Sequence, residues 1–370
     1  MITFLEIVTF LSLGLYLYYS YIFYKGLKKR PKLHNFTRPF VSVIIAARNE
    51  EKNISKLLIY LINQSYPSDR YEIIVADDGS EDNTKEIVQS FEKNQDNLHY
   101  LKIEDRENYV SPKKNALQKA IEKSRGELLL FTDADCFVGK NWIASMVENF
   151  EKNVDMVCGF SKTKINDWDK RGFVQKFEHF DFLVMFFAAA GAISSGKYFS
   201  CSGQNIAYRK SVFNEIGGFS GIMHIQSGDD VNLLQLFRKA GKKAVFSFGY
   251  SSFVYTQPID SFFSLINQRS RWASNFKYQF DLNPEFFVYL SGVFLITYLP
   301  FVMLFYHLYM GIVIILLKFF ADLLFTHKAF SIFKIEKKRI KFFAIWYIFQ
   351  PIYIFIVTFF GLFEVFRWKK

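Results

Sequence analysis

The stretch VSVIIAARNEE, residues 41–51, decides the fold class. Its first seven residues form a nearly continuous run of β-branched and small apolar side chains. Such a run is typical of a strand that is buried on both faces of a parallel sheet. The run stops at Arg48, Asn49 and Glu50, and helix-forming residues follow to about residue 63. An apolar strand, a polar turn and a helix in this order predict the first unit of an α/β domain.

The same order recurs further along the chain. Residues 72–76 (EIIVA) stop at DDGS (77–80), and residues 128–131 (LLLF) lead through a threonine to DAD (133–135). In open α/β sheets, ligands bind at the carboxyl ends of the strands. We therefore predict that residues 41–260 form an α/β domain with a mostly parallel sheet, covering helices and a polar edge.

The basic charge of the chain lies at its two ends. The net charge is +11, of which residues 1–40 carry +5, residues 283–370 carry +6 and the middle carries none. A protein that binds a phosphate backbone would carry the excess on its folded domain, so nucleic acid is excluded as a partner. The three cysteines are odd in number and lack CxxC spacing, which disfavours a disulfide framework and a zinc site and favours a reducing compartment.

Residues 1–24 are predicted to be a transmembrane anchor. Residues 2–24 are apolar apart from Glu6 and are long enough to cross a bilayer. Basic residues follow this run, in a linker over residues 25–40, whereas a secretory signal peptide has them before it. The distribution predicts an uncleaved anchor whose carboxyl side lies in the cytoplasm.

Residues 283–370 are predicted to be a second transmembrane region with three spans. The apolar run 286–317 would be about 48 Å long as one helix, which exceeds the thickness of a bilayer core. We expect a hairpin with its turn at residues 307–311 and a last span at 342–366. Lys318 and Asp322, one helical turn apart, are expected to pair inside the protein. The result is a multi-pass protein of the inner or plasma membrane with a cytoplasmic catalytic domain.

Two acidic clusters follow strands. Asp77 and Asp78 could accept hydrogen bonds from a nucleobase or a ribose, although the same residues are common in strand-to-helix turns. Asp133 and Asp135 could hold Mg²⁺ or Mn²⁺, which prefer oxygen ligands, although an exposed acidic turn has the same sequence.

Two further motifs lie later in the chain. Asp229 and Asp230 precede an amphipathic helix, where an aspartate acts either as a helix cap or as a general base. Residues 261–282 are predicted to be an interfacial helix that contains QRSRW (268–272). The arginines of this motif suit a pyrophosphate and the tryptophan suits a sugar ring, whereas an aromatic and basic membrane belt would explain the same residues.

In this order, VSVIIAARNEE, VADDGS, TDADC, SGDD and QRSRW resemble the motifs of family 2 glycosyltransferases. The resemblance covers roughly residues 41–280. It is closer to the membrane-anchored branch that contains the cellulose, hyaluronan and poly-N-acetylglucosamine synthases. It implies a GT-A-like nucleotide-sugar-binding fold with N- and C-terminal transmembrane helices, and inversion at the anomeric carbon.

The resemblance also implies a role for each candidate residue. Asp230 would be the catalytic base, with Asp229 in the place of the usual glutamate, and Asp133 and Asp135 would bind the divalent cation, Mg²⁺ or Mn²⁺. Lys113, in PKKNAL where the family has a glycine in place of the proline, would lie near the diphosphate. The other substrate-binding residues would be Asp77, Asp78, Arg48 and Glu50 for the uridine, and Gln268, Arg269, Arg271 and Trp272 for the diphosphate and the acceptor.

The function expected from the resemblance is transfer of a sugar from a UDP-sugar to a hydroxyl acceptor, in polysaccharide or glycan synthesis. Two alternatives stay open: a single addition to a membrane lipid, and a non-catalytic partner subunit that binds nucleotide sugars. The expected partners are the UDP-sugar donor, a glycan or lipid acceptor and membrane lipids. A homo-oligomer or an export partner would be needed for a wide channel, because four spans are few.

Overall fold

The computed structural model describes residues 4–29, 37–104 and 110–367. Residues 30–36 of the predicted basic linker, and the terminal Lys369 and Lys370, lie outside the described residues. The chain divides into two compact units. The sheet unit comprises Arg30–Lys164 and Ser200–Gln257, and the helical unit comprises Met1–Lys29, Ile165–Phe199 and Pro258–Lys370.

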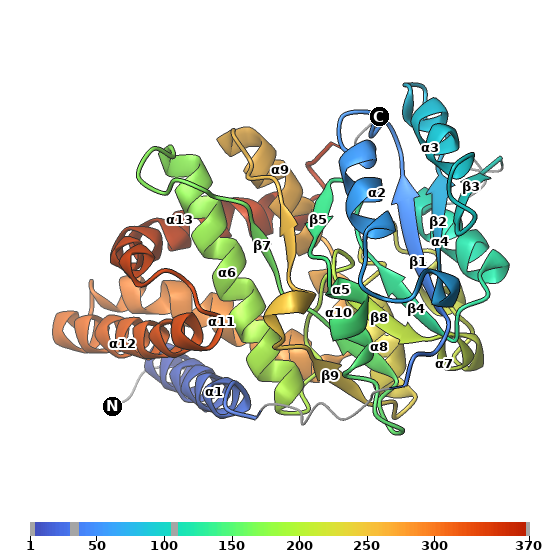
Figure 1. Cartoon of the computed structure of the whole chain (residues 1–370). Coiled ribbons are helices and arrows are strands. Elements are labelled where there is room, and N and C mark those ends of the chain that lie inside the picture. Colours follow the sequence, from blue (N-terminus) through green and yellow to red (C-terminus); the bar gives the residue numbers. More distant parts are fainter. Residues whose placement is uncertain (1–3, 30–36, 105–109, 368–370) are drawn as a thin grey trace. The chain divides into compact units, whose positions relative to one another are not determined.

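The sheet unit is built on a mixed sheet whose strand order, over the described residues, is β3-β2-β1-β4-β8-β6-β9 (Figure 1). The first four strands in this order are parallel, and β8 is antiparallel to both of its neighbours. The predicted mostly parallel sheet is therefore confirmed. The strands are β1 (Val41–Ala47), β2 (Tyr71–Asp77), β3 (Leu98–Lys102), β4 (Leu128–Phe131), β6 (Met156–Cys158), β8 (Ile206–Arg209) and β9 (Ala244–Phe246).

A smaller sheet and short helices complete this unit. The smaller sheet has the order β5-β10-β7 among the described residues, with β5 at Cys136–Val138, β10 at Val254–Thr256 and β7 at Ser161–Thr163. The α-helices are α2 (Ile54–Ile62), α3 (Thr84–Glu92), α4 (Pro112–Lys123), α5 (Trp142–Val147), α7 (Lys210–Glu215) and α8 (Val231–Lys239). Single 3-10 turns lie at Ser68–Arg70, Ser220–Ile222 and Tyr250–Ser252.

The core of the sheet unit explains why its strands are continuous apolar runs. Val41, Val43 and Ile45 of β1 are fully buried, and they pack in one cluster with Leu57 and Leu58 of α2. Helices that cover a parallel sheet leave its inner strands without a solvent face, so these strands contain few polar residues. At roughly 1.5–3 kcal/mol for each large apolar side chain, this burial is the main stabilising contribution.

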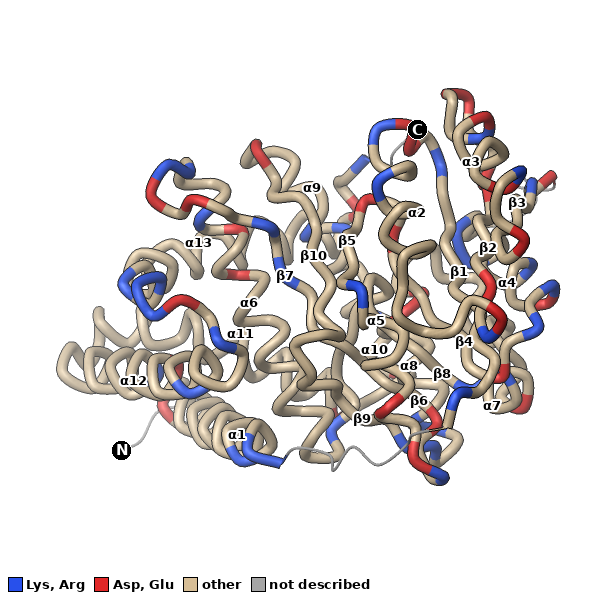
Figure 2. The backbone as a smooth tube through the Cα atoms, viewed as in Figure 1, with Lys and Arg blue, Asp and Glu red and all other residues tan. Residues whose placement is uncertain are grey.

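The helical unit contains the apolar segments. Five of the described helices are long and apolar enough to cross a membrane: α1 (Phe4–Gly26), α6 (Phe173–Ser194), α11 (Pro284–Met303), α12 (Leu308–Ile332) and the segment Lys337–Leu362, which is a 3-10 turn (Lys337–Phe342) followed by α13 (Phe343–Leu362). Figure 2 shows long uncharged stretches along α1, α11 and α12. The sequence predicts four spans, and α6 is not among them.

The predicted hairpin is confirmed as two helices in place of one long helix. Helix α11 ends at Met303 and α12 begins at Leu308, so the break falls beside the expected turn. Within α12, Lys318 is buried and its Nζ lies 2.8 Å from Asp322 Oδ2, as the sequence predicted. The hydroxyl of Tyr16 in α1 also donates to Asp322, so each charge has a partner inside the protein.

The predicted interfacial helix is divided in two. Helix α9 spans Phe262–Ala273, and α10 spans Phe276–Leu282. At the start of α9, Ser261 Oγ accepts a hydrogen bond from the backbone N–H of Ser264 and so caps the helix. Helix α9 packs on α13, and α10 packs on α11, within the same unit.

Candidate active site

The carboxyl ends of β1, β2 and β4 bring the predicted residues to one edge of the sheet. In the register of β1 and β2, Ala47 pairs with Asp77, so both strands end at the same level. The backbone N–H of Asp78 donates to Ala47 O at 2.9 Å, which continues this pairing by one step. The next residue, Gly79, has a φ of 73°, a conformation that favours glycine and turns the chain towards α3.

The loops after β1 and β2 are joined by hydrogen bonds. The N–H of Asn49 donates to Ser80 Oγ at 3.0 Å, and the N–H of Glu50 donates to Thr84 Oγ1 at 2.8 Å. The Glu50 carboxylate accepts from Asn53 Nδ2 at 2.9 Å and is largely buried. These contacts fix the backbone around Arg48 and Glu50.

Asp77 and Asp78 differ in their surroundings. The Asp77 carboxylate accepts from the N–H of Ser80 and from the hydroxyl of Tyr100, each at 2.8 Å, and so holds the turn together. Burial raises the pKa of Asp78 to about 6; the charge of Asp77 adds to this rise, and Arg48 opposes it. The Asp77 carboxylate thus has two protein donors that fix it in the turn.

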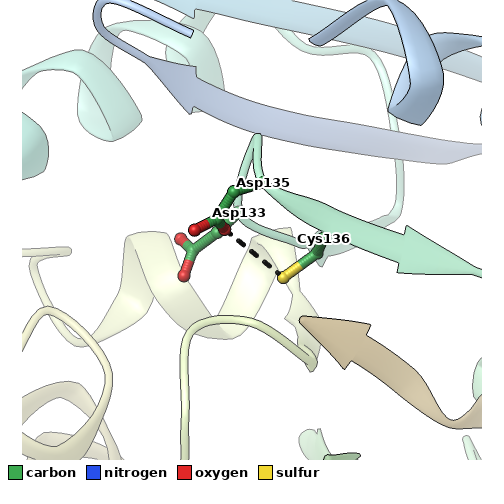
Figure 3. A group of neighbouring side chains, drawn as sticks. All are labelled: Asp133, Asp135 and Cys136. Atoms are coloured by element: carbon green, nitrogen blue, oxygen red, sulfur yellow. Dashed lines mark hydrogen bonds between the residues drawn. The ribbon is translucent and has the colours of Figure 1, made fainter. Parts of the chain in front are cut away.

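Asp133, Asp135 and Cys136 form a group that could hold a metal ion. One ligand atom from each residue lies within 4.8 Å of the other two (Figure 3). The Cys136 thiol lies 3.7 Å from Asp135 Oδ1. Burial, together with the charges of the two aspartates, raises the pKa of Cys136. Mg²⁺ and Mn²⁺ prefer oxygen ligands to sulfur. The two carboxylates remain as the strong ligands, and this donor set fits Mg²⁺ or Mn²⁺.

Lys113 connects this group to the motif before α8. Its Nζ lies 3.1 Å from Asp133 Oδ1 and 3.1 Å from Asp229 Oδ2. Burial would lower the pKa of Lys113, but the negative charges of Asp133, Asp229 and Asp230 outweigh it and raise the pKa. Lys113 is therefore a permanent cation between two acidic motifs that are almost 100 residues apart in sequence.

Asp230 lies at the N-cap of α8. Its Oδ1 accepts from the N–H of Val231 at 2.6 Å, and its Oδ2 accepts from the N–H of Gly203 at 2.7 Å. Burial and the charge of Asp229 raise the pKa of Asp230, against the opposing effect of Lys113. For Asp229, burial also acts to raise the pKa, but Lys113 and Lys114 outweigh it and lower the pKa. The two adjacent carboxylates thus have opposite shifts.

Four of the predicted residues line one pocket: Lys113, Asp133, Asp229 and Asp230. Gly203 and Tyr208 line it as well, together with the apolar side chains of Leu117 and Phe131. Tyr208 did not stand out in the sequence, because a tyrosine within a short strand is common in any fold. The pocket combines cationic, anionic and apolar walls.

The QRSRW motif lies on α9 in the helical unit. The Arg269 side chain is buried, and its guanidinium lies 3.3 Å from Asp181 Oδ2 and 3.7 Å from Glu178 Oε1, both on α6. It also lies over the Trp272 ring, 4.2 Å from the ring centroid, and donates to Gln268 Oε1. The sequence predicts that Arg269 contacts the substrate, whereas these contacts of its guanidinium are all with residues of the helical unit.

Fold and site together define the class: a GT-A-like domain with an acidic site at the carboxyl edge of a mostly parallel sheet, in a chain with apolar helices. Comparison with known proteins then gives the family. Residues 42–217 match the family model Glycosyl transferase family 2, so the chain contains a family 2 glycosyltransferase domain.

Two curated relatives and one solved structure illustrate the similarity. The chain is 32% identical over 212 residues to Glycosyltransferase AglE of Haloferax volcanii, which is 57% of this chain and 65% of that protein. It is 32% identical over 136 residues to Beta-monoglucosyldiacylglycerol synthase of Trichormus variabilis, 36% of this chain and 29% of that protein. The matches therefore span less than two thirds of either relative.

The mannosyltransferase PcManGT of Pyrobaculum calidifontis, solved in complex with GDP-Man and Mn²⁺, has a similar fold. The TM-score is 0.64 at 18% identity, over 97% of this chain and 99% of that chain. At this level of identity the similarity concerns the fold alone.

Proposed function

We propose that this protein transfers a sugar, with inversion, from a UDP-sugar to a hydroxyl group of an acceptor at the membrane. The observation that carries the proposal is the placement of Lys113 between Asp133 and Asp229, in the same pocket as Asp230. This pocket offers a cation for a leaving diphosphate, one carboxylate of the proposed metal site, Asp133, and a separate carboxylate for a proton. These are the groups that a single displacement at a sugar carbon needs.

Asp230 is the base in this mechanism. Each of its oxygens accepts one backbone N–H, which fixes the carboxylate and leaves further lone pairs for the acceptor hydroxyl. The raised pKa makes Asp230 a better proton acceptor than an ordinary aspartate. As the proton moves to Asp230, the hydroxyl oxygen bonds to C1 of the sugar, and the bond from C1 to the diphosphate oxygen breaks.

The remaining residues bind and orient the donor. We assign the uridine to Asp77 and Asp78, with Arg48 and Glu50, at the ends of β1 and β2. Lys113 offsets the charge that develops on the diphosphate. The roles expected of Gln268, Arg271 and Trp272 towards the diphosphate and the acceptor stay proposals that rest on the resemblance of the QRSRW motif. Asp133 and Asp135 would hold Mg²⁺ or Mn²⁺, which supplies Lewis-acid stabilisation of the leaving phosphate.

Two versions of this function differ in the acceptor that receives the sugar. The completeness of the motif set supports polysaccharide or glycan synthesis, with an oligomer or export partner to complete a channel. The similarity to a glucosyldiacylglycerol synthase supports a single addition to a membrane lipid. In both versions we place the sheet unit on the cytoplasmic side of the inner or plasma membrane. The non-catalytic alternative, a partner subunit that binds nucleotide sugars, requires no base at Asp230.

The test is nucleotide release by the full chain purified in detergent with native lipids. The donors are UDP-glucose, UDP-N-acetylglucosamine, UDP-galactose, UDP-glucuronate and GDP-mannose, each with Mg²⁺, with Mn²⁺ or with EDTA. We expect release from one UDP-sugar that depends on the metal and is lost in Asp230→Asn. Asp96→Asn, an exposed position of the same unit, is the matched control. Product size distinguishes a polymer from a glycolipid, and the anomeric configuration tests inversion.

Wild-type activity in Asp230→Asn would contradict the assignment of the base. Turnover in EDTA would contradict the assignment of Asp133 and Asp135. If the protein bound a UDP-sugar but released no nucleotide with any combination of donor and lipid acceptor, the partner-subunit alternative would be favoured.

A further inference from the structure

Lys114, which follows the bridging Lys113, is a fully buried lysine. Its side chain leaves α4 towards the segment that precedes Asp229. The Nζ atom donates to Ile225 O, to Ser227 O at 3.1 Å and to Ser111 Oγ at 3.5 Å. An ammonium group has three N–H donors, so these acceptors account for all of them. Burying an ammonium is costly unless every donor has a partner, which ties its position to these carbonyl groups.

Ser111 makes a parallel contact. A serine at the N-cap of a helix ordinarily accepts a hydrogen bond from its own first turn, but Ser111 makes no such bond. Its hydroxyl instead donates to Gln226 O at 3.0 Å. Ser111 and Lys114 together therefore bind the carbonyl groups of three consecutive residues, 225–227, from the first turn of α4.

The segment held in this way leads directly to the proposed base. The next residue, Gly228, has a φ of 74° and turns the chain into Asp229 and Asp230. Asn232 in α8 also donates to Ser227 O, at 3.3 Å, so the turn is held from both sides. The first turn of α4 thus contacts the active site in two ways. Lys113 binds the side chains of Asp133 and Asp229, and Lys114 and Ser111 bind the backbone carbonyl groups of residues 225–227.

We propose that Lys114 and Ser111 are positioning residues that fix segment 225–228 and thereby orient the Asp230 carboxylate towards the acceptor hydroxyl. This inference rests on the glycosyltransferase activity proposed above. Neither residue is among those that line the pocket, and the polar atoms of both side chains bind backbone groups of residues 225–227. Their effect is on the alignment of the base, which governs the chemical step, and not on donor binding.

The experiment compares four variants of the full chain in detergent: Lys114→Met, Lys114→Arg, Ser111→Ala and, as the matched control, Lys123→Met. Lys123 lies at the exposed end of the same helix. A displacement of about 1 Å in a catalytic group costs on the order of 10²-fold, so we expect about this loss of kcat in Lys114→Met. We expect UDP affinity to stay within a factor of about 3 of wild type, Lys114→Arg to recover part of kcat, and Lys123→Met to equal wild type.

Hydrogen–deuterium exchange supplies a readout that does not depend on turnover. We expect faster exchange at the backbone amides of residues 226–232 in Lys114→Met and Ser111→Ala, with β1 and β2 unchanged. Unchanged exchange in this segment, or a kcat within a factor of about 2 of wild type in folded Lys114→Met, would overturn the proposal. If Lys114→Met does not fold, Ser111→Ala and Lys114→Arg decide by the same criteria.

The proposed glycosyltransferase function and the positioning role of Lys114 and Ser111 would be overturned by different results. Absence of turnover in wild type with every donor would remove the proposed function, whereas the exchange data would still test whether these residues hold segment 225–228. Lower UDP affinity with unchanged kcat would place Lys114 in donor binding and overturn the positioning role.

Discussion

Lys113 and Asp229 form an ion pair with 3.1 Å between Nζ and Oδ2. This pair explains why two adjacent carboxylates behave differently. Lys113 contributes to lowering the pKa of Asp229, whereas Asp230 is bound by two backbone N–H groups and its pKa is raised by burial and by the charge of Asp229. One aspartate is thus a fixed counterion and the other is the group suited to accept a proton. Sites that pair an acid with a base often separate the two pKa values in this way.

The first prediction concerns Lys113. In Lys113→Met we expect kcat to fall by about 10²–10³-fold, the usual effect of removing one group that stabilises transition-state charge. Lys113 lowers the pKa of Asp230, so its removal raises that pKa. A base acts when deprotonated, so the acidic limb of the pH–kcat profile should move to higher pH. The measurement is nucleotide release between pH 5 and pH 9. A lower activity with an unmoved acidic limb would show that Lys113 and Asp230 are not coupled.

The second prediction concerns Gly203. A Cβ atom at this position would lie 3.3 Å from Asp229 Oδ2 and 3.6 Å from Asp230 Oδ2. In Gly203→Ala the Asp229 carboxylate must therefore shift by a few tenths of an ångström, whereas the contact with Asp230 is an ordinary one. Because Asp229 adjoins the proposed base, and alignment of the base is sensitive to small shifts, we expect kcat to fall by about 10-fold. Gly139→Ala is the matched control, because a Cβ there would make only an ordinary contact of 3.8 Å in the same unit. Equal activities of the two variants would count against the role of Asp230.

The third prediction concerns Asp78. Burial raises its pKa to about 6, so the folded protein binds this proton more tightly than the unfolded chain does. Between about pH 4 and pH 6 the unfolded chain loses the proton first, and stability therefore decreases as pH rises through this window. Asp78→Asn removes this effect, and we expect a higher Tm than wild type at pH 7 and a smaller difference at pH 4.

The same substitution is expected to weaken UDP binding, because it replaces one carboxylate oxygen, an acceptor proposed for the uridine, with an NH₂ donor. Titration calorimetry at pH 7 measures this effect. An Asp78→Asn variant that is more stable and binds UDP as tightly as wild type would assign Asp78 to the fold and leave the uridine to other residues.

The strand ends could be predicted from the sequence because buried parallel strands contain almost nothing but apolar residues. The positions of Asp77 and Asp133 followed from the ends of these runs. The contacts of Lys113 and Lys114 could not be predicted, because two adjacent lysines on a helix look equivalent in sequence and only tertiary packing distinguishes the buried one. Helix α6 was missed because Glu178 and Asp181 interrupt its hydropathy, and their charges are compensated by Arg269 from a distant part of the chain.

The fourth prediction concerns Arg269, for which sequence and structure suggest different roles. As a buried partner of Asp181 and Glu178, it should matter mainly for stability, because removing one partner of a buried ion pair costs about 3–5 kcal/mol. In Arg269→Gln we therefore expect Tm to fall by several degrees, with a smaller fall in Arg269→Lys, which keeps the charge. Arg271→Gln, two residues further along the same helix at a half-buried position, should keep the wild-type Tm and lose activity.

The measurement is fluorescence-monitored thermal unfolding in detergent, alongside the Km for the donor at a temperature where all variants are folded. Tyr353 also donates to Asp181, at 3.1 Å, so Tyr353→Phe should lower Tm in the same direction and by less. If Arg269→Gln instead kept the wild-type Tm and raised the Km for the donor, Arg269 would contact the substrate, as the QRSRW motif alone predicts. In that case the ion pair with Asp181 would have to open when the donor binds.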